Sequence, residues 1–139
     1  MYSVEKKIQV RYAETDQMGV VYHTNYLVWF EIGRTQLIES LGFSYAALEN
    51  EGYFSPVIDL TATYKRAIRY DDKPIIKTWL EKYDGLRITY GYEVLNEQRE
   101  VCVYGTTMHT CVQKETFRPI SIKKKLPKWH EAYENIKRS

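Results

Sequence analysis

The chain is poor in cysteine, with two among its 139 residues. Cys102 and Cys111 are separated by an odd number of positions, so on one extended strand their side chains point to opposite faces. This argues against a disulfide between them. The N-terminal residues also lack the charged and then apolar pattern of a signal peptide. We therefore expect a cytoplasmic protein whose thiols are reduced.

Long apolar runs and clustered glycines are missing as well. No stretch approaches the roughly 18 apolar residues that a membrane span needs, so none is expected. The seven glycines are scattered and form no phosphate-holding loop, which disfavours nucleotide hydrolysis and dinucleotide binding. The chain has no Gly-x-Ser-x-Gly turn of a serine hydrolase. Its three histidines have no metal-ligand spacing relative to the cysteines, so no metal site is expected.

Charge of one sign is not in excess either. The formal net charge is +2, which argues against a nucleic-acid-binding protein because such proteins carry a clearly basic patch. What the chain does contain is 44% hydrophobic residues and 13 tyrosines, a composition typical of a globular protein. The length predicts one domain, residues 1–139, with a core of ordinary size.

Apolar and polar residues alternate in a way that predicts strands. At the N-terminus, residues 4–12 show this period-two pattern, with one face of the expected strand in contact with water. Four later segments are rich in β-branched and aromatic residues and are separated by turn-forming residues. They cover residues 54–67, 75–82, 86–95 and 101–113. The turn at Asp84–Gly85 is expected to join two of these strands as a hairpin.

Three helices are expected between and after these strands. The longest covers residues 25–41, is apolar on nearly all sides in its first half and ends at Gly42. A short helix is expected over residues 45–50, and apolar residues at helical spacing predict a third over 127–137. One long helix followed by four strands can be buried only if the sheet curls around it. The sequence thus predicts an α+β fold, with a curled antiparallel sheet of about five strands around one central helix.

An acidic residue and a glycine turn lie directly before the long helix, in residues 11–26. Asp16 and Gly19 favour a turn there. The first N–H groups of a helix have no partner within it. Thr24 or Asn25 could cap only one of these groups, because neither begins a capping box. Other N–H groups at this end are therefore expected to be free.

The expected free donors are the backbone N–H groups of Val21, Tyr22 and His23. Together with the helix dipole, they would stabilise negative charge that develops on a carbonyl oxygen, as an oxyanion hole does. Asp16, just upstream, could act as a nucleophile or as a general base. The side chain of His23 could also contact the substrate. The segment is therefore suited to chemistry on a carbonyl group.

A longer pattern extends over this segment. Residues 12–26 read Tyr-x-x-Thr-Asp-x-x-Gly-Val-Val-Tyr-His-x-Asn-Tyr and are followed by Phe30-Glu31 and Arg34. The pattern resembles the 4-hydroxybenzoyl-CoA thioesterase-like family of hotdog-fold acyl-CoA thioesterases. The likeness is strong over residues 4–41, looser through the later strands and weak at the C-terminus. It implies a hotdog fold, hydrolysis of an acyl-CoA thioester to free acid and CoA with no separate cofactor, and a homodimer or homotetramer with active sites at the subunit interface.

The substrate pocket is expected beside the long helix. Its candidate lining residues are Asn25, Tyr26 and Trp29, with Tyr53 and Phe54 as further candidates, and aromatic walls suit both aryl and aliphatic acyl groups. Short-chain, long-chain and aromatic substrates, including a naphthoyl-CoA, therefore stay open. Surface cations would have to hold the CoA nucleotide. The candidates for this role are Lys65, Arg66, Lys82, Arg87 and Arg118.

Other polar residues are assigned to structure. Glu31 and Arg34 lie three positions apart on the long helix, where an ion pair is the ordinary expectation. His109, within a strand, is interpreted as a hydrogen-bonded core residue. Lys123, Lys124 and Lys125 are interpreted as a solvated basic segment.

Two alternative functions are weighed against thioester hydrolysis. A hotdog hydratase or dehydratase acting on enoyl or hydroxyacyl thioesters would need a histidine and an acid on opposite sides of the substrate. His23 and Asp16 instead lie in one short segment. A non-catalytic acyl-CoA-binding partner would gain nothing from a carboxylate aimed at a thioester. Hydrolysis is therefore the function that the sequence favours.

Overall fold

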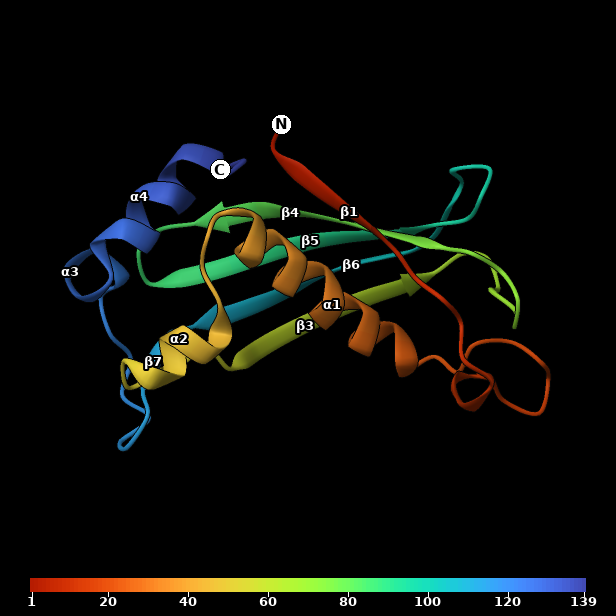
Figure 1. Cartoon of the computed structure of the whole chain (residues 1–139), viewed down its shortest axis with the longest axis horizontal. Coiled ribbons are helices and arrows are strands. Elements are labelled where there is room, and N and C mark those ends of the chain that lie inside the picture. Colours follow the sequence, from red (N-terminus) through yellow and green to blue (C-terminus); the bar gives the residue numbers. More distant parts are fainter.

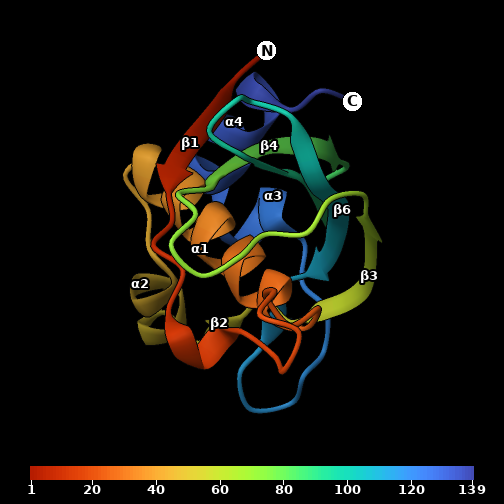
Figure 2. The same ribbon diagram turned by 90° about the vertical axis from the view of Figure 1, so that its right-hand side faces the viewer.

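Five strands form one antiparallel sheet that curls around helix α1 (Asn25–Ser40) in the computed structural model, which describes all 139 residues (Figure 1). Figure 2 shows from one end how the sheet bends around the helix. The order across the sheet is β1 (Ser3–Lys7), β4 (Ile75–Tyr83), β5 (Arg87–Leu95), β6 (Val101–Thr110) and β3 (Val57–Tyr64). Every neighbouring pair is antiparallel. The predicted α+β architecture is confirmed.

A smaller sheet and three further helices lie at the end of the molecule where α1 finishes, on the left in Figure 1. The sheet pairs β2 (Tyr53–Phe54) with β7 (Val112–Gln113), and the helices are α2 (Tyr45–Asn50), α3 (Ile122–Lys125) and α4 (Pro127–Ile136). The strands predicted over 54–67 and 101–113 are thus each divided, because the chain passes between the two sheets. The terminal helix expected over 127–137 corresponds to α4. None of the helices has the length and apolar character needed to cross a membrane.

The N-terminal strand is shorter than the predicted range, 4–12. Strand β1 ends at Lys7, which pairs with Ile75, the first residue of β4. Residues beyond Lys7 have no neighbouring strand to pair with, although Ile8 remains buried in the core. The chain then forms a single turn of 3-10 helix, η1 (Tyr12–Glu14). The prediction was wrong in its second half because alternation cannot show where the partner strand begins.

Helix α1 buries one face against the sheet. Phe30 stacks on Tyr92 of β5, with ring centroids 4.3 Å apart. Gly33 lies so close to β4 that a Cβ atom there would collide with the side chain of Thr78. The opposite face is less covered, and Val28 remains 43% exposed. Although the first half of the helix is apolar on nearly all sides, the sheet of one chain covers only one of its faces.

The ion pair expected between Glu31 and Arg34 is not among the ion pairs of the structure. Glu31 is exposed, whereas the Nε atom of Arg34 is buried and has no hydrogen-bond partner. The side chain of Arg34 therefore turns toward the protein interior and away from Glu31. A spacing of three residues places two side chains on one helix face but does not fix which of them is buried.

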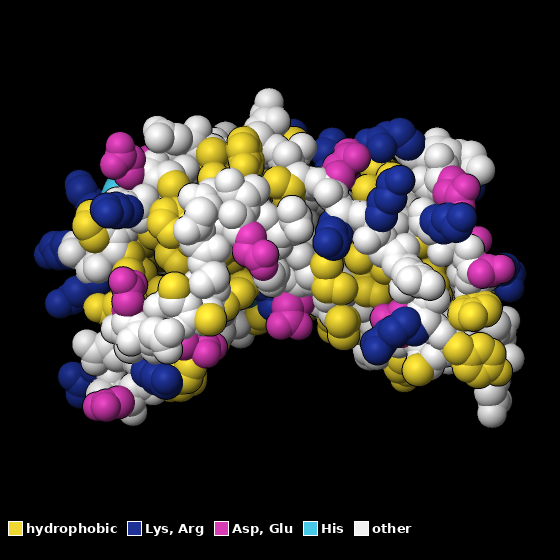
Figure 3. Space-filling view, in the orientation of Figure 1, with side chains coloured by type: hydrophobic (Ala, Val, Ile, Leu, Met, Phe, Trp, Pro, Cys, Tyr) yellow, Lys and Arg dark blue, Asp and Glu magenta, His cyan; other side chains and the backbone are white.

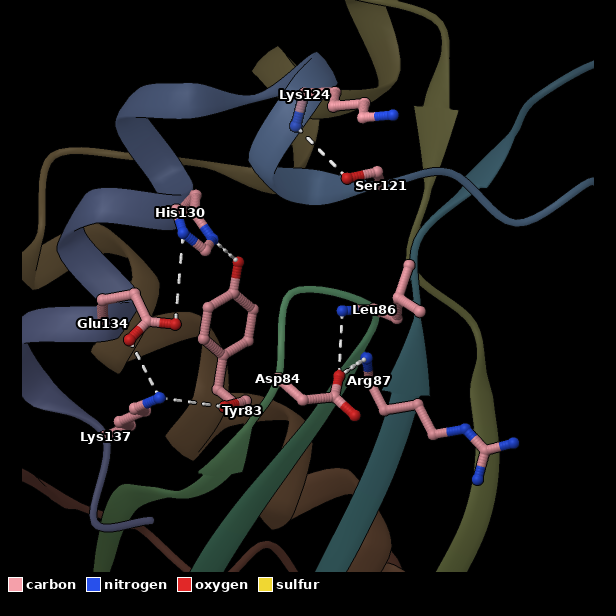
Figure 4. Close-up of polar contacts among 9 residues, drawn as sticks. All are labelled: Tyr83, Asp84, Leu86, Arg87, Ser121, Lys124, His130, Glu134 and Lys137. Atoms are coloured by element: carbon pink, nitrogen blue, oxygen red, sulfur yellow. Dashed lines mark hydrogen bonds and ion pairs between the residues drawn. The ribbon is translucent and has the colours of Figure 1, made fainter.

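The predicted hairpin between β4 and β5 is confirmed (Figure 4). The carboxylate of Asp84 accepts hydrogen bonds from the backbone N–H groups of Arg87 and Leu86, at 2.7 and 2.9 Å. These bonds hold the pKa of the Asp84 carboxyl below its usual value. The hydroxyl of Tyr83 lies 2.6 Å from Nδ1 of His130. The terminal helix α4 is thereby fixed against the start of this hairpin.

His109 is fully buried in β6 and hydrogen-bonded at both ring nitrogens, as interpreted from the sequence. Its Nδ1 donates to the carbonyl oxygen of Ser55 at 3.0 Å, since a carbonyl can only accept. Its Nε2 therefore accepts from the hydroxyl of Thr107 at 2.9 Å, and that hydroxyl also pairs with Tyr92. This arrangement suits the neutral ring, and burial lowers the pKa of His109 from 6.5 to about 4.

The lowered pKa of His109 predicts an acid-sensitive stability. The unfolded chain binds a proton on this residue near pH 6.5, whereas the folded protein resists it until about pH 4. The contribution of neutral His109 to the free energy of unfolding is therefore fully present above the unfolded pKa. It is lost as the pH drops from about 6.5 to 4, by roughly 3 kcal/mol in total. Urea unfolding of wild type and His109→Gln across this range measures the difference. Equal pH dependence in the two proteins, or an NMR titration of His109 near pH 6.5, would contradict the prediction.

Candidate active site

The chain between η1 and α1 forms the loop expected at the N-terminus of the long helix, at the right in Figure 1. The N–H of Asp16 donates to the carbonyl oxygen of Val20 at 2.9 Å, and the N–H of Gly19 donates to that of Asp16 at 3.0 Å. Gly19 has a φ of 75°, in the left-handed region that glycine adopts at no steric cost. The turn predicted from Asp16 and Gly19 is confirmed.

The carboxylate of Asp16 is fixed at one oxygen and free at the other. Its Oδ1 accepts hydrogen bonds from the backbone N–H groups of Met18 at 2.8 Å and Val20 at 3.4 Å. No hydrogen bond or ion pair of the structure uses its Oδ2. The side chain is only half-buried. Asp16 therefore combines a fixed orientation with an oxygen that can accept a proton or attack a carbonyl carbon.

Asp16 lines a pocket of about 350 Å³ between this loop and the end of β3. Five other residues proposed from the sequence line the same pocket, and they are Val21, His23, Tyr26, Lys65 and Arg66. The pocket therefore combines a carboxylate, aromatic side chains and two cations. Small-molecule sites commonly have this mixture of apolar walls and a few polar groups.

Two of the three N–H groups predicted to be free are occupied. The N–H of Val21 donates to the carbonyl oxygen of Ile68 at 2.7 Å, and the N–H of Tyr22 donates to that of Glu14 at 2.8 Å. The prediction of Val21 and Tyr22 as substrate donors was therefore wrong. The reason is that the fold of the loop brings these N–H groups to carbonyl oxygens, one of them in a distant segment, which the local sequence does not reveal.

Three other N–H groups at this end form no hydrogen bond within the chain, and they belong to His23, Thr24 and Tyr26. Thr24 occupies the N-cap position of α1, but its side chain makes no capping bond. The helix start thus keeps unpaired donors together with the positive end of its dipole. His23 remains a candidate donor, and Thr24 and Tyr26 join it.

Tyr64, at the end of β3, is a pocket residue that the sequence did not single out for the site. Its hydroxyl donates to the carbonyl oxygen of His23 at 3.0 Å. Its ring packs edge-on against the rings of Tyr26 and His23, with centroids 5.5 and 6.3 Å apart. Tyr64 therefore holds the peptide that leads into α1. Burial raises the pKa of its neighbour Tyr26 to about 12, so the hydroxyl of Tyr26 stays protonated near neutral pH.

Glu14 anchors the loop to the helix and was also missed. Its carboxylate is buried and accepts from the indole N–H of Trp29 at 3.1 Å and the backbone N–H of Arg11 at 2.8 Å. Its carbonyl oxygen accepts from the side-chain amide of Asn25 at 3.1 Å. Neither Trp29 nor Asn25 lines the Asp16 pocket. Within one chain, the side chains of Asn25 and Trp29 therefore hold Glu14 instead of facing this pocket, and their role in the substrate pocket stays a prediction.

The five cations proposed for CoA are divided between the two ends of the folded molecule. Lys65 and Arg66 line the Asp16 pocket, and Arg66 also forms an ion pair with Glu100 at 3.1 Å. Lys82 and Arg87 line a different pocket at the β4–β5 hairpin, where Figure 4 shows Arg87.

The remaining predicted residues belong to the far end as well. Arg118 follows β7, and Tyr53 and Phe54 form β2. Within one chain, none of these three lines the Asp16 pocket. The structure also has no group of three or more His, Cys, Asp or Glu side chains positioned to hold a metal ion.

Known proteins with similar sequences extend over nearly the whole chain. One is a putative acyl-CoA thioesterase, YneP, from Bacillus subtilis, 49% identical over 138 residues that cover 99% of this chain and 100% of that protein. Another is the acyl-CoA thioester hydrolase YbgC of Escherichia coli O157:H7. It is 27% identical over 119 residues, which cover 86% of this chain and 89% of the relative.

Structural similarity agrees with the sequence relatives. A crystal structure of DHNA-CoA thioesterase from Staphylococcus aureus has a TM-score of 0.95 and 48% identity, and the match covers 97% of this chain and 91% of that one. A hypothetical protein from Thermus thermophilus has a TM-score of 0.84 and 31% identity, over 94% of this chain and 98% of that one. Residues 10–130 match the profile of the thioesterase-like superfamily. The chain belongs to this superfamily and has its hotdog fold.

Proposed function

We propose that the protein hydrolyses an acyl-CoA thioester to a free acid and CoA in the pocket lined by Asp16. The observation that carries the proposal is the carboxylate of Asp16, with one oxygen held by backbone N–H groups and the other free, beside unpaired donors at the start of α1. The relatives support it, since the B. subtilis protein is named a putative acyl-CoA thioesterase and the E. coli protein an acyl-CoA thioester hydrolase.

In this mechanism the thioester carbonyl oxygen accepts hydrogen bonds from unpaired N–H groups at the start of α1, that of His23 first. The helix dipole stabilises the negative charge that this oxygen gains. Asp16 acts in one of two ways. As a base it takes a proton from the water that bonds to the carbonyl carbon, and as a nucleophile it forms an anhydride that water then hydrolyses. In both cases the C–S bond breaks and the CoA sulfur leaves and gains a proton.

The same pocket supplies groups for the rest of the substrate. Lys65 and Arg66 lie beside Asp16 and would bind the phosphates of CoA. Tyr26 and Tyr64 offer aromatic surface to the acyl group. The mechanism needs no metal ion and no separate cofactor, because CoA enters as part of the substrate.

Release of free thiol from a panel of acyl-CoAs tests the proposed function. The panel contains short, long and aromatic acyl groups, with DHNA-CoA as the first aromatic member because the S. aureus relative is described as its thioesterase. Thiol release from one class above the rate without enzyme supports hydrolysis and identifies the acyl class. Tight binding of CoA without release from any member would favour a non-catalytic binding protein instead.

Tyr64→Phe is expected to lower kcat about two- to tenfold with little change in KM, which corresponds to the loss of one hydrogen bond. The phenol hydroxyl orients the peptide between His23 and Thr24 at the start of α1. Tyr104→Phe is a matched control, because Tyr104 is also exposed but its hydroxyl makes no hydrogen bond. Steady-state measurements of kcat and KM for both variants test this role of the Tyr64 hydroxyl. Equal kcat values in Tyr64→Phe and wild type would contradict the role.

We further propose a homodimer or a larger homo-oligomer assembled along β3. This strand lies at the edge of the sheet and exposes Val57, Ile58, Leu60 and Tyr64 by 39–48%. An exposed apolar edge strand is a ready template for pairing with another strand. Antiparallel pairing of two β3 strands would therefore cover this edge.

Such pairing would also complete the active site. An antiparallel arrangement of β3 with its copy brings Tyr64 of one chain toward the Val57 end of the other. Arg87 lies at that end, since it pairs with Thr110 next to the partner position of Val57. The second chain would thus bring the far-end cations, Arg87 and Arg118, toward the Asp16 pocket. The active site would then lie at the subunit interface.

Leu60→Lys is expected to weaken this association and to lower turnover together with it. A buried lysine at the centre of the interface would be unpaired and costly to desolvate. Sedimentation equilibrium gives the oligomeric state, and thiol release gives the activity. Lys6→Gln, on the opposite edge strand β1, is the control. A Leu60→Lys protein with unchanged mass in solution would contradict the β3 interface.

We also propose that the protein works in the cytoplasm. Cys102 and Cys111 are both buried and free. Reduced thiols are the ordinary state in that compartment. Fractionation of cells that express the protein is the direct measurement.

A further inference from the structure

A second pocket lies at the opposite end of α1 from Asp16, between α2 with its preceding turn and the corner that joins α3 to α4. Its volume is about 450 Å³, compared with about 350 Å³ for the Asp16 pocket. The 16 residues of α1 separate the two, which corresponds to about 24 Å along the helix axis. The two pockets have no residue in common. The second pocket is therefore distinct from the proposed active site.

Apolar and aromatic side chains form the walls of this second pocket. Phe43 and Trp129 face each other as a stacked pair, with ring centroids 4.7 Å apart and planes 9° apart. Leu48 and Leu126 line it too, and with Trp129 they also line a narrower apolar recess against the main sheet. The walls are thus suited to a compact apolar or aromatic group.

The rim of the second pocket is basic. Lys125 and Lys128 line it, are exposed and belong to no ion pair of the structure. The only acidic residue in the lining is Glu51. Lys123 and Lys124 lie next to the rim on α3, and Figure 3 shows basic side chains gathered around the end of the molecule formed by α3 and α4, at the left. The local charge therefore favours an anion over an apolar floor.

We propose that the second pocket binds a small organic monocarboxylate with an apolar body, such as an aryl carboxylate. The ring lies against Phe43 and Trp129, and the carboxylate lies at Lys125 and Lys128. A volume of about 450 Å³ suits one such molecule. Two lysines and one glutamate give the lining a net charge of +1, which one carboxylate would neutralise. The inference does not depend on the proposed thioesterase activity, because no residue of the Asp16 pocket takes part.

Titration of the protein with 1-naphthoate, followed by NMR, tests the proposal. The indole N–H signal of Trp129 is expected to shift in a saturable way, whereas that of Trp29, bonded to Glu14, stays in place. The neutral analogue 1-naphthylmethanol is expected to bind more weakly, because it lacks the charge. The same titration of Asp16→Asn should give the same affinity.

Two sets of variants locate the binding site. Lys125→Gln with Lys128→Gln is expected to weaken 1-naphthoate binding about five- to tenfold, as the loss of two exposed charge contacts allows. Lys123→Gln with Lys124→Gln makes the same charge change outside the pocket lining and should leave affinity nearly unchanged. Ala47→Phe, on the α2 wall, should fill the pocket and abolish binding, with an unchanged circular dichroism spectrum.

Several outcomes would overturn the proposal. They are no saturable shift of Trp129 at millimolar 1-naphthoate, equal weakening by the two lysine pairs, and equal affinity for the neutral alcohol. Protection of residues 43–48 from hydrogen exchange that grows with protein concentration would also overturn it. That result would show that a second copy of the chain covers the pocket.

Discussion

Asp16→Asn is expected to abolish most thioester hydrolysis, with a fall in kcat of about a hundred- to ten-thousand-fold, the usual contribution of a positioned acid or base. The amide keeps an oxygen that can accept the hydrogen bonds from Met18 and Val20. The loop should therefore stay in place and the melting temperature should change little. The amide cannot take a proton from water, and it is a poor nucleophile toward a carbonyl carbon. Activity should fall without a loss of structure.

Thiol release and thermal melting, measured side by side, separate these two effects. Glu131→Gln is a matched control, because it removes one exposed carboxylate from α4, at the other end of the molecule from the Asp16 pocket. It should keep full activity. Turnover by Asp16→Asn at a rate near that of wild type would remove Asp16 from the mechanism. Loss of activity together with early melting would instead indicate that the carboxylate supports the loop.

The elements that follow from local periodicity could be predicted from the sequence. The bounds of α1 are nearly those expected, because a long, largely apolar segment follows the polar loop and Gly42 ends it with a φ of 88°. The N-terminal strand was predicted too long. Its end depends on where β4 begins, at Ile75, and that contact is distant in sequence. Local pattern therefore fixes the type of an element better than its limits.

The candidate site was predicted in the same partial way. The motif placed Asp16 and His23 in one pocket at the start of α1, as the structure shows. It could not show which N–H groups are free, because the acceptors for Val21 and Tyr22 come from the carbonyl groups of Ile68 and Glu14. Glu14 is near Tyr22 in the sequence, but only the fold of the loop brings its carbonyl oxygen to the N–H of Tyr22.

The second large effect is expected at Glu14, whose buried carboxylate joins η1 to α1. In Glu14→Ala, the indole N–H of Trp29 and the backbone N–H of Arg11 lose their acceptor. An unsatisfied buried donor costs about 1–3 kcal/mol, so the free energy of unfolding should fall by about 2–5 kcal/mol. Glu14→Gln should cost less, because the amide oxygen can still accept from one of the two donors.

A double-mutant cycle with Trp29→Phe tests the contact directly. Phenylalanine fills most of the space of the indole but has no N–H, so in its background Glu14→Ala leaves one donor fewer unsatisfied. We expect an interaction energy of about 1–3 kcal/mol between the two positions, measured by urea unfolding. Trp79→Phe combined with Glu14→Ala is the control, because Trp79 bonds Glu81 and not Glu14. Additive effects of Glu14→Ala and Trp29→Phe would show that the bond does not stabilise the fold.

The same contact should govern activity, because Glu14 precedes Asp16 by two residues and its carbonyl oxygen accepts from Tyr22 and Asn25. A shift of Glu14 would therefore move both ends of the catalytic loop. We expect Glu14→Gln, at a temperature where it is fully folded, to lower kcat while KM changes less, since the error lies in the placement of Asp16 against the helix start. Full kcat in this variant would mean that the hydrogen bonds of Asp16 with Met18 and Val20 suffice to hold the carboxylate.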